Sequence, residues 1–314
     1  MGRTVFLYAG QGSQSVGMGR DLYEAYPLFR ETADRLFGVL SFDARELMWN
    51  GPEERLTQTE YTQPCMAVFA ASMTELLRSE GIVPDAAAGL SLGEYGAMYA
   101  AGVFDAEDYV RTVAFRGSAM AEAVKGIESS MSAVVGADAD SVREACCRAE
   151  QAGAGFVTVV NYNCPGQYVI CGDEDAVAAA EKEAAGLGAK RCIRLKVSAP
   201  FHTKYLKEAG DRLFDYLGTV KLDTPRIPVA VNVTGDFLEP DADIRSILKT
   251  QVFSSVHFED DLRKLLESGY DRFIEIGPGN ALTGFLKKTS LKLGIKPESI
   301  CLQTAQDVRK LIEH

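Results

Sequence analysis

Residues 86–101 read Ala-Ala-Ala-Gly-Leu-Ser-Leu-Gly-Glu-Tyr-Gly-Ala-Met-Tyr-Ala-Ala. A short apolar run ends at Gly89, and a stretch of small, helix-compatible residues begins after Ser91. The G-x-S-x-G sequence from Gly89 to Gly93 is typical of a strand that turns sharply into a helix, with the serine at the apex. The glycines permit a close approach of the backbone on either side. We therefore expect Ser91 to point away from a sheet, although similar turns also occur without any chemistry.

A serine at such a turn can act as a nucleophile if a base lies beside it. The N–H of Leu92, at the start of the following helix, can help to hold the oxyanion that forms. The chain contains three histidines. His202 lies between a predicted strand and a predicted helix, where α/β folds place functional groups, although such a loop can also simply cap a helix. We expect His257 to be structural, and His314 lies at the chain end.

A catalytic histidine also needs an acceptor that fixes its tautomer. In many serine enzymes this acceptor is a carboxylate. No acidic residue of this sequence is clearly placed for that role, and a backbone or side-chain carbonyl can replace it. Gln251 is one candidate, although its spacing from the histidine does not establish the contact.

The sequence alternates between strand and helix patterns on both sides of this turn, which predicts an α/β fold with a mostly parallel sheet and helices on both faces. The predicted strands include residues 4–9, 86–89, 227–232 and 271–276. The predicted helices include 21–37, 62–80 with Pro64 in the first turn, 106–124, 204–217, 241–251 and 258–268, and a last strand and helix close the chain.

The middle of the chain has a different order of elements. Strands are predicted at 131–136, 156–162, 167–172 and 190–197, with helices at 139–151 and 174–187. This β-α-β-β-α-β order is that of a ferredoxin-like fold. We therefore expect an inserted α+β subdomain over residues 128–197, and a catalytic core formed by residues 1–127 and 198–314.

Composition excludes several classes of function. The net charge of −11 argues against nucleic acid as a partner, because phosphate binding requires an excess of Lys and Arg. The seven cysteines show no CxxC spacing and indicate reduced thiols, as in the cytoplasm. No run is apolar enough for a membrane span, and residues 1–6 do not resemble a secretory signal. No metal-binding motif is evident.

Residues 10–14, Gly-Gln-Gly-Ser-Gln, follow the first strand and only weakly resemble a dinucleotide-binding loop, because Ser15 occupies the position of the third glycine. They match a different family. Together with other motifs along the whole chain, they make the sequence similar to the malonyl-CoA:acyl-carrier-protein transacylases. The other motifs are Thr62–Pro64, Gly89–Glu94, Arg116–Gly117, Asn161–Gln167, Ala199–His202, Asn232–Thr234 and Glu275–Gly279.

The resemblance implies an α/β-hydrolase-like core with a ferredoxin-like insert, in agreement with the pattern of elements. It implies that Ser91 is the nucleophile and His202 the general base. Gln11 and the N–H of Leu92 match the oxyanion hole, and the carbonyl region of Gln251 matches the group that orients the histidine.

Other positions match the family's substrate pocket. Arg116 corresponds to the arginine that binds the malonyl carboxylate, a role suited to a planar guanidinium; without the resemblance, an arginine in an Ala-rich helix would be expected in solvent. Asn161 and Gln63 match pocket-lining positions. Phe201 fits members in which bulk leaves little room for a 2-methyl branch. Many members have His where this chain has Leu90, which leaves the nucleophile unchanged.

The resemblance therefore implies an acyltransferase that moves malonyl from CoA, through an ester on Ser91, to the phosphopantetheine thiol of acyl carrier protein in fatty-acid synthesis. CoA thioester is its substrate, and no permanently bound cofactor is expected. The alternatives are a stand-alone polyketide-type acyltransferase, a serine esterase and a non-catalytic carrier-binding module. An acidic carrier protein would need local basic groups, for which Lys190–Arg191, Lys204–Lys207 and Lys287–Lys288 are candidates.

Overall fold

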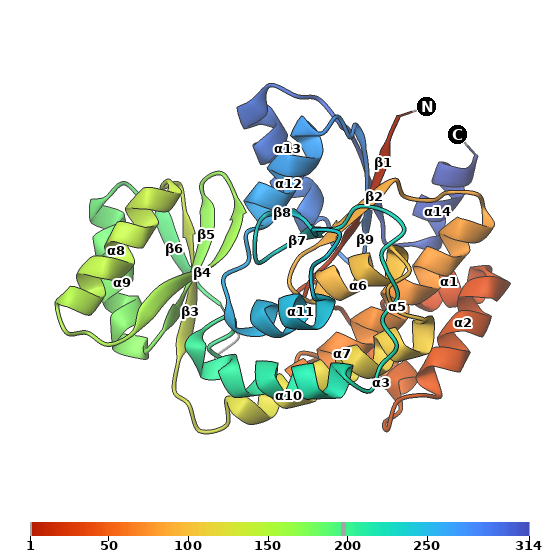
Figure 1. Cartoon of the computed structure of the whole chain (residues 1–314), viewed down its shortest axis with the longest axis horizontal. Helices are drawn as coiled ribbons and strands as arrows, with labels where there is room; N and C mark the ends of the chain where they lie inside the picture. Colours follow the sequence, from red (N-terminus) through yellow and green to blue (C-terminus); the bar gives the residue numbers. More distant parts are fainter. Residues whose placement is uncertain (1, 196–198, 314) are drawn as a thin grey trace.

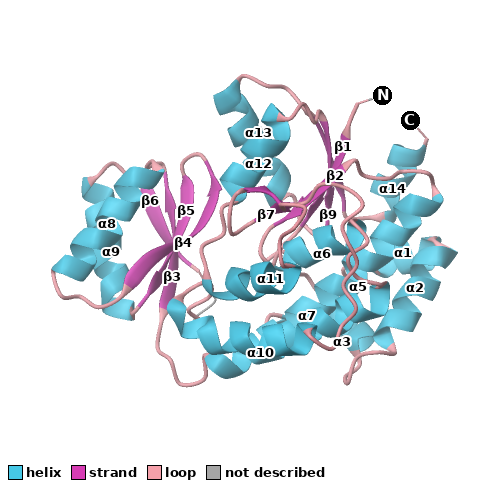
Figure 2. Ribbon diagram, viewed as in Figure 1, coloured by secondary structure: helices cyan, strands magenta, loops and turns pink. Residues whose placement is uncertain are grey.

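The computed structural model describes residues 2–195 and 199–313 and contains two main sheets (Figures 1 and 2). The first sheet has the order β10-β9-β1-β2, and all of its paired strands run parallel. Its strands are β1 (Thr4–Tyr8), β2 (Ala86–Gly89), β9 (Arg272–Ile276) and β10 (Glu298–Leu302). The predicted α/β class is confirmed.

Helices cover both faces of this sheet (Figure 1), and alternate residues of each strand point to opposite faces, so both faces bury apolar side chains. Phe6 and Tyr8 of β1 belong to one buried cluster, whereas Val5 and Leu7 belong to another. The helices of this part are α1 (Arg20–Ala25), α2 (Pro27–Phe37), α3 (Ala44–Asn50), α4 (Glu53–Leu56), α5 (Thr59–Ser79), α6 (Leu92–Ala100), α7 (Ala106–Ala123), α10 (Lys207–Leu217), α11 (Ile244–Phe253), α12 (Phe258–Glu267), α13 (Ala281–Leu293) and α14 (Ala305–Ile312).

The second sheet forms the separate lobe at the left of Figure 1, and its paired strands run antiparallel in the order β4-β5-β3-β6. Along the chain its elements follow the predicted order: β3 (Ser130–Val135), α8 (Ala139–Gln151), β4 (Val157–Cys164), β5 (Gln167–Gly172), α9 (Glu174–Gly186) and β6 (Arg191–Arg194). The helices α8 and α9 pack on this sheet through a buried cluster of their own.

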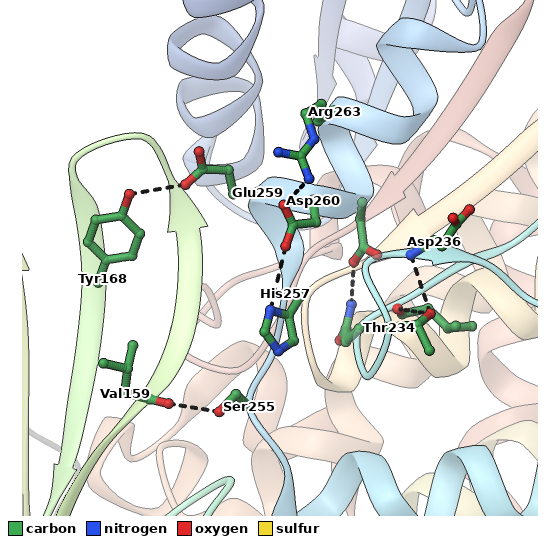
Figure 3. Close-up of polar contacts among 12 residues, drawn as sticks. Val159, Tyr168, Thr234, Asp236, Ser255, His257, Glu259, Asp260 and Arg263 are labelled. Atoms are coloured by element: carbon green, nitrogen blue, oxygen red, sulfur yellow. Dashed lines mark hydrogen bonds and ion pairs between the residues drawn. The ribbon is translucent and has the colours of Figure 1, made fainter. Parts of the chain in front are cut away.

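Strand β4 joins the two lobes, because it pairs with the segment that leads into α12. The N–H of Val256 donates to Val160 O at 2.8 Å, and the N–H of Tyr162 donates to Val256 O at 2.8 Å. The Ser255 hydroxyl donates to Val159 O at 2.8 Å, and this contact is drawn in Figure 3. The chain between α11 and α12 is therefore held by both lobes.

Three predicted elements differ from the structure around prolines. The predicted strand 227–232 is reduced to β7 (Ala230–Val231), which pairs with β8 (Asp236–Phe237), because a proline such as Pro228 supplies no ladder N–H. The predicted helix 21–37 is interrupted at Tyr26, just before Pro27. Pro64 lies inside α5 and not in its first turn, because the N–H of Thr62 already donates to Gln58 O and the helix starts at Thr59.

Two further predictions differ at element ends. The predicted helix 204–217 begins as a 3₁₀ turn, η1 (Lys204–Leu206), before α10. The predicted strand 190–197 corresponds to the shorter β6, and its last two residues lie outside the described part of the chain. His314 and the boundary predicted at 197–198 also lie outside it.

Candidate active site

Ser91 lies at the apex of the turn between β2 and α6, with φ 53° and ψ −101°. Positive φ is unusual for a residue with a side chain and costs conformational energy. The motif glycines make the turn possible: a Cβ on Gly89 would overlap the carbonyl group of Gly93, and a Cβ on Gly93 would overlap the Tyr8 carbonyl oxygen. The predicted turn, with its serine at the apex, is therefore present.

The structure brings Ser91 and His202 together, although they are 111 positions apart in the chain. The Ser91 Oγ lies 2.7 Å from Nε2 of His202. The other ring nitrogen, Nδ1, lies 3.0 Å from the main-chain oxygen of Gln251 and 3.1 Å from that of Ser254. Both oxygens are acceptors, so Nδ1 carries the proton and Nε2 is free to accept the Ser91 proton. The orienting acceptor is thus a pair of carbonyl groups.

His202 is only 5% exposed. Burial lowers its pKa to about 4, and the positive charge of Arg116 acts in the same direction. The two carbonyl acceptors oppose this shift by stabilising the protonated ring. At neutral pH the imidazole is therefore uncharged and can accept a proton, as a general base must.

Arg116 is buried to 1% exposure, unlike most helical arginines. Its Nη2 donates to Ser91 Oγ at 3.2 Å and to Gln251 Oε1 at 3.1 Å, and its Nη1 donates to Gln63 Oε1 at 2.8 Å. These acceptors are all neutral, and within the described residues Nε has no hydrogen-bond acceptor. A buried cation without a bound carboxylate is costly, so this group is well placed to receive an anion beside Ser91.

Gln11 and Gln63 extend this polar cluster. The Gln11 amide Nε2 donates to Thr59 Oγ1 at 3.0 Å, and its Oε1 accepts a long hydrogen bond of 3.5 Å from Gln63 Nε2. Gln11 therefore connects through Gln63 to Arg116.

Leu92 is the first residue of α6, and the N–H at this position has no acceptor within the helix.

A cavity of about 380 Å³ opens beside His202. Its lining comes from both lobes: Phe156, Thr158, His202, Thr203, Lys204, Val233, Phe253, Ser254, Ser255 and His257. A larger cavity of about 630 Å³ is lined by residues 222–229, 236–240, 242, 244 and 264, so it lies apart from the Ser91–His202 pair. Of these two cavities, the smaller is the one that His202 lines.

His257 has a different environment from His202. Its ring stacks on Tyr162 with centroids 4.9 Å apart. Its Nδ1 lies 3.5 Å from Asp260, a contact drawn in Figure 3. It thus links α12 to β4 at the junction of the lobes. The expectation that His257 is structural agrees with these contacts.

The remaining predicted positions are Phe201 and Leu90, which immediately precede His202 and Ser91 in the chain, and Asn161. Phe201 is buried next to His202. Asn161 lies on β4 and bridges to Val256, two residues beyond the Ser254 carbonyl. Leu90 packs against the apolar cluster on one side of the first sheet.

Comparison with known proteins identifies the family. A family model described as an acyl transferase domain matches residues 5–313. The malonyl CoA-acyl carrier protein transacylase of Bacillus subtilis (strain 168) is 39% identical over 293 residues, covering 93% of this chain and 92% of the relative. The chain belongs to the malonyl-CoA–acyl carrier protein transacylase family.

Other members of the transacylase family agree in sequence and in structure. The Escherichia coli (strain K12) enzyme is 37% identical, covering 92% of this chain and 93% of its own. The crystal structure of MCAT from Streptococcus pneumoniae is 40% identical, with a TM-score of 0.91 and 99% of each chain covered. A complex of a type II PKS acyl-carrier protein with its malonyl-transacylase is 33% identical, with a TM-score of 0.92 and 99% of each chain covered.

Within this transacylase fold, sequence reasoning missed three residues behind Ser91 that form a buried network: Glu94, Asn232 and Asp261. Glu94 and Asn232 were noted only as parts of the family motifs Gly89–Glu94 and Asn232–Thr234. Burial raises the pKa of Glu94 to about 7. An acidic residue in the first turn of a helix is normally explained by its favourable interaction with the helix dipole, so the sequence carried no signal for this network.

No described helix is long and apolar enough to cross a membrane.

Proposed function

We propose that this chain transfers malonyl from coenzyme A to the phosphopantetheine thiol of acyl carrier protein through an ester on Ser91. The observation that carries the proposal is the buried Arg116 guanidinium, 3.2 Å from Ser91 Oγ. A fixed cation beside the nucleophile favours an acyl group that ends in a carboxylate, and it disfavours neutral acyl groups, which leave the cation unpaired. A serine esterase has no need of such a group.

In the first half-reaction the Ser91 hydroxyl attacks the thioester carbon, and its proton moves to Nε2 of His202. The Gln11 amide and the Leu92 N–H act as the oxyanion hole. The position of Leu92 as the first residue of α6 supports this role, because an N–H there has no acceptor within the helix. The C–S bond then breaks, and the departing CoA sulfur takes the proton from His202. A malonyl ester remains on Ser91.

The second half-reaction reverses these steps with a different thiol. His202 takes the proton of the pantetheine thiol, its sulfur attacks the ester carbon, and Ser91 regains the proton as the C–O bond breaks. The cavity beside His202 supports entry of the second thiol, because it offers a route for a long pantetheine arm. CoA is therefore a substrate, and no permanently bound cofactor takes part.

We assign the remaining substrate contacts to the predicted pocket residues. Gln63 Oε1 accepts a hydrogen bond from Arg116 Nη1 and so positions the guanidinium. The main-chain oxygen of Gln251 orients His202. Phe201 and Asn161 complete the pocket, supported by the burial of Phe201 next to His202 and by the position of Asn161 on the strand that adjoins the cavity wall. Bulk from Phe201 would disfavour a methyl branch on the acyl chain.

The two lobes correspond in our proposal to two domains. Residues 1–127 and 198–314 form an α/β-hydrolase-like core, supported by the parallel sheet and the serine turn. Residues 128–197 form a ferredoxin-like subdomain, supported by the β4-β5-β3-β6 order and the helices on that sheet. The active site then lies where the subdomain strand β4 meets the core.

Acyl carrier protein would dock at the cavity mouth. Of the basic pairs in the sequence, Lys204–Lys207 is the best candidate, because Lys204 lines the cavity beside His202. Lys190 and Arg191 lie instead at the edge strand β6, and Lys288 donates to Gln167. We place the protein in the cytoplasm, in agreement with its seven free cysteines. The relative in complex with a polyketide carrier protein favours such a carrier as the alternative acceptor.

Replacing Arg116 by alanine tests the malonyl assignment. Breaking a buried ion pair from one side costs roughly 3–5 kcal/mol, less where water enters the pocket. At about 1.4 kcal/mol per tenfold change, malonyl transfer should fall by roughly two to three orders of magnitude. Acetyl transfer should fall far less, because that group carries no charge. Both rates are measured in one preparation of Arg116→Ala.

Arg111→Ala is the matched control, because Arg111 lies on the same helix but pairs with Glu107 and Asp108 in solvent. It should leave both rates within about twofold, as for most surface substitutions. Equal losses of malonyl and acetyl transfer in Arg116→Ala would refute the carboxylate-binding role.

A further inference from the structure

Two buried side chains hold the main-chain groups of Ser91 from outside its own turn. The Ser91 N–H donates to Asn232 Oδ1 at 2.8 Å. Its carbonyl oxygen accepts from Gln251 Nε2 at 2.7 Å. A backbone conformation as rarely populated as that of Ser91 persists only where its surroundings determine it strongly. These two contacts supply that constraint.

Asn232 is 0% exposed and is itself fixed in one orientation. Its amide nitrogen Nδ2 donates to Gly89 O at 2.8 Å and to Asp261 Oδ2 at 2.7 Å. Its own N–H donates to Glu94 Oε2 at 2.7 Å. An inverted amide would place its oxygen against two acceptors and its nitrogen against the Ser91 N–H. The carbonyl end must therefore face Ser91.

The anchors of Asn232 are two buried carboxyl groups. Glu94 Oε1 and Asp261 Oδ1 are both buried without a hydrogen-bond partner in the described part of the chain. Burial raises the pKa of both groups, and the Glu94 charge raises that of Asp261 further. Burying a carboxyl group costs free energy that an apolar side chain at the same position would not cost. In each of the two groups, the oxygen that does form a hydrogen bond accepts it from Asn232: Oε2 of Glu94 and Oδ2 of Asp261.

We propose that Asn232 is a positioning residue for acyl transfer: anchored by Asp261 and Glu94, it fixes the Ser91 peptide so that the hydroxyl meets His202. This inference rests on the proposed role of Ser91 as the nucleophile. Because the Ser91 N–H is engaged by Asn232, it is turned away from the reacting carbonyl group. The Leu92 N–H is left as the main-chain donor of the oxyanion hole.

The test uses Asn232→Asp in the full-length protein. The new carboxylate retains an acceptor for the Ser91 N–H, but its second oxygen faces the acceptors Gly89 O and Asp261. We expect kcat for malonyl transfer to fall by about 10²-fold, the scale of a misplacement near 1 Å, with KM within about threefold. Labelling of Ser91 by a small sulfonyl fluoride, which needs no malonyl recognition, should slow in parallel.

A double variant exchanges the donor and the acceptor of the hydrogen bond between residues 232 and 261. In Asn232→Asp/Asp261→Asn, the new amide at position 261 can donate to the new carboxylate, so the interaction between the two side chains is restored. We expect the double variant to recover at least about tenfold in kcat, the scale of coupling between residues in direct contact. Asp261→Asn alone should lose less than Asn232→Asp, because its side chain keeps an acceptor for Asn232.

Leu265→Ala separates positioning from general destabilisation. Leu265 is fully buried on α12, the helix that carries Asp261. The change should lower the melting temperature while leaving kcat and Ser91 labelling within about twofold. If Asn232→Asp does not accumulate in folded form, Asn232→Ser carries the same expected loss, because its short hydroxyl cannot link Ser91 to Asp261.

The inference is overturned if folded Asn232→Asp keeps kcat and labelling within threefold of the original chain. It is also overturned if the loss lies only in KM, or if the double variant recovers nothing. Failure of the proposed function looks different: the unaltered chain would be labelled by the sulfonyl fluoride at Ser91 but would not accept malonyl from CoA. In that case the labelling rates alone decide the role of Asn232.

Discussion

Ser91→Ala is expected to reduce malonyl transfer by about 10⁶-fold, the loss known from removing the nucleophile of a serine protease. The alanine methyl cannot form the ester, and in the described part of the chain the hydrogen-bond partner of His202 Nε2 is Ser91 Oγ. The rate is measured with malonyl-CoA and carrier protein under saturating conditions. Any residual rate then reports transfer that does not pass through an ester on Ser91.

Ser79→Ala is the control for this substitution. Ser79 lies in the last turn of α5, and its hydroxyl donates to Leu76 O within that helix. Its loss should leave malonyl transfer unchanged within about twofold. A Ser91→Ala protein that still gains a malonyl group covalently would show that another residue is the nucleophile.

His202→Ala is expected to slow transfer by roughly 10²–10⁴-fold, the range for loss of a general acid–base. The effect should fall on both half-reactions, because the same imidazole accepts the proton from Ser91 and from the incoming thiol. His257→Ala is the natural control: its ring contacts Tyr162 and Asp260, and its loss should affect transfer much less. A larger loss in His257→Ala would move the base to that residue.

The pH dependence tests the same residue without a substitution. Because burial lowers the pKa of His202 to about 4, the imidazole stays neutral until the pH falls to that region. The kcat/KM of the free enzyme should therefore stay high as pH falls through 6.5 and decline only near pH 4. The decline should be absent in His202→Ala. A midpoint near 6.5 in the unaltered chain would contradict a buried, neutral base.

The main elements of the fold follow from the sequence because hydrophobic periodicity and turn glycines are local signals. The G-x-S-x-G turn is the clearest example, since Gly89 and Gly93 are required by direct overlap with main-chain atoms. The prediction of a strand over 227–232 was wrong in its extent, because a proline has no N–H to donate to a neighbouring strand, whatever the apolar pattern around it. Local propensity cannot show where such a segment finds its hydrogen bonds.

The site was predictable only in part, for a related reason. His202 could be proposed because a chain with few histidines offers few bases. The carbonyl groups of Gln251 and Ser254 that orient it could not be deduced from spacing, because every residue has a carbonyl group. The contact from Asn232 to Ser91 spans 141 positions and depends on how the chain after β7 packs against the end of β2. No pattern in the sequence reports such a long-range contact.

The central claim is a malonyl ester on Ser91 that is passed to a thiol and not to water. The most direct measurement is the intact mass of the protein after mixing with malonyl-CoA, followed by addition of carrier protein bearing phosphopantetheine. We expect one malonyl adduct on Ser91 that persists in buffer and disappears rapidly when the thiol is added, with little adduct from acetyl-CoA or methylmalonyl-CoA. Spontaneous loss of the adduct at a rate unaffected by the thiol, or equal labelling by all three CoA esters, would contradict the claim.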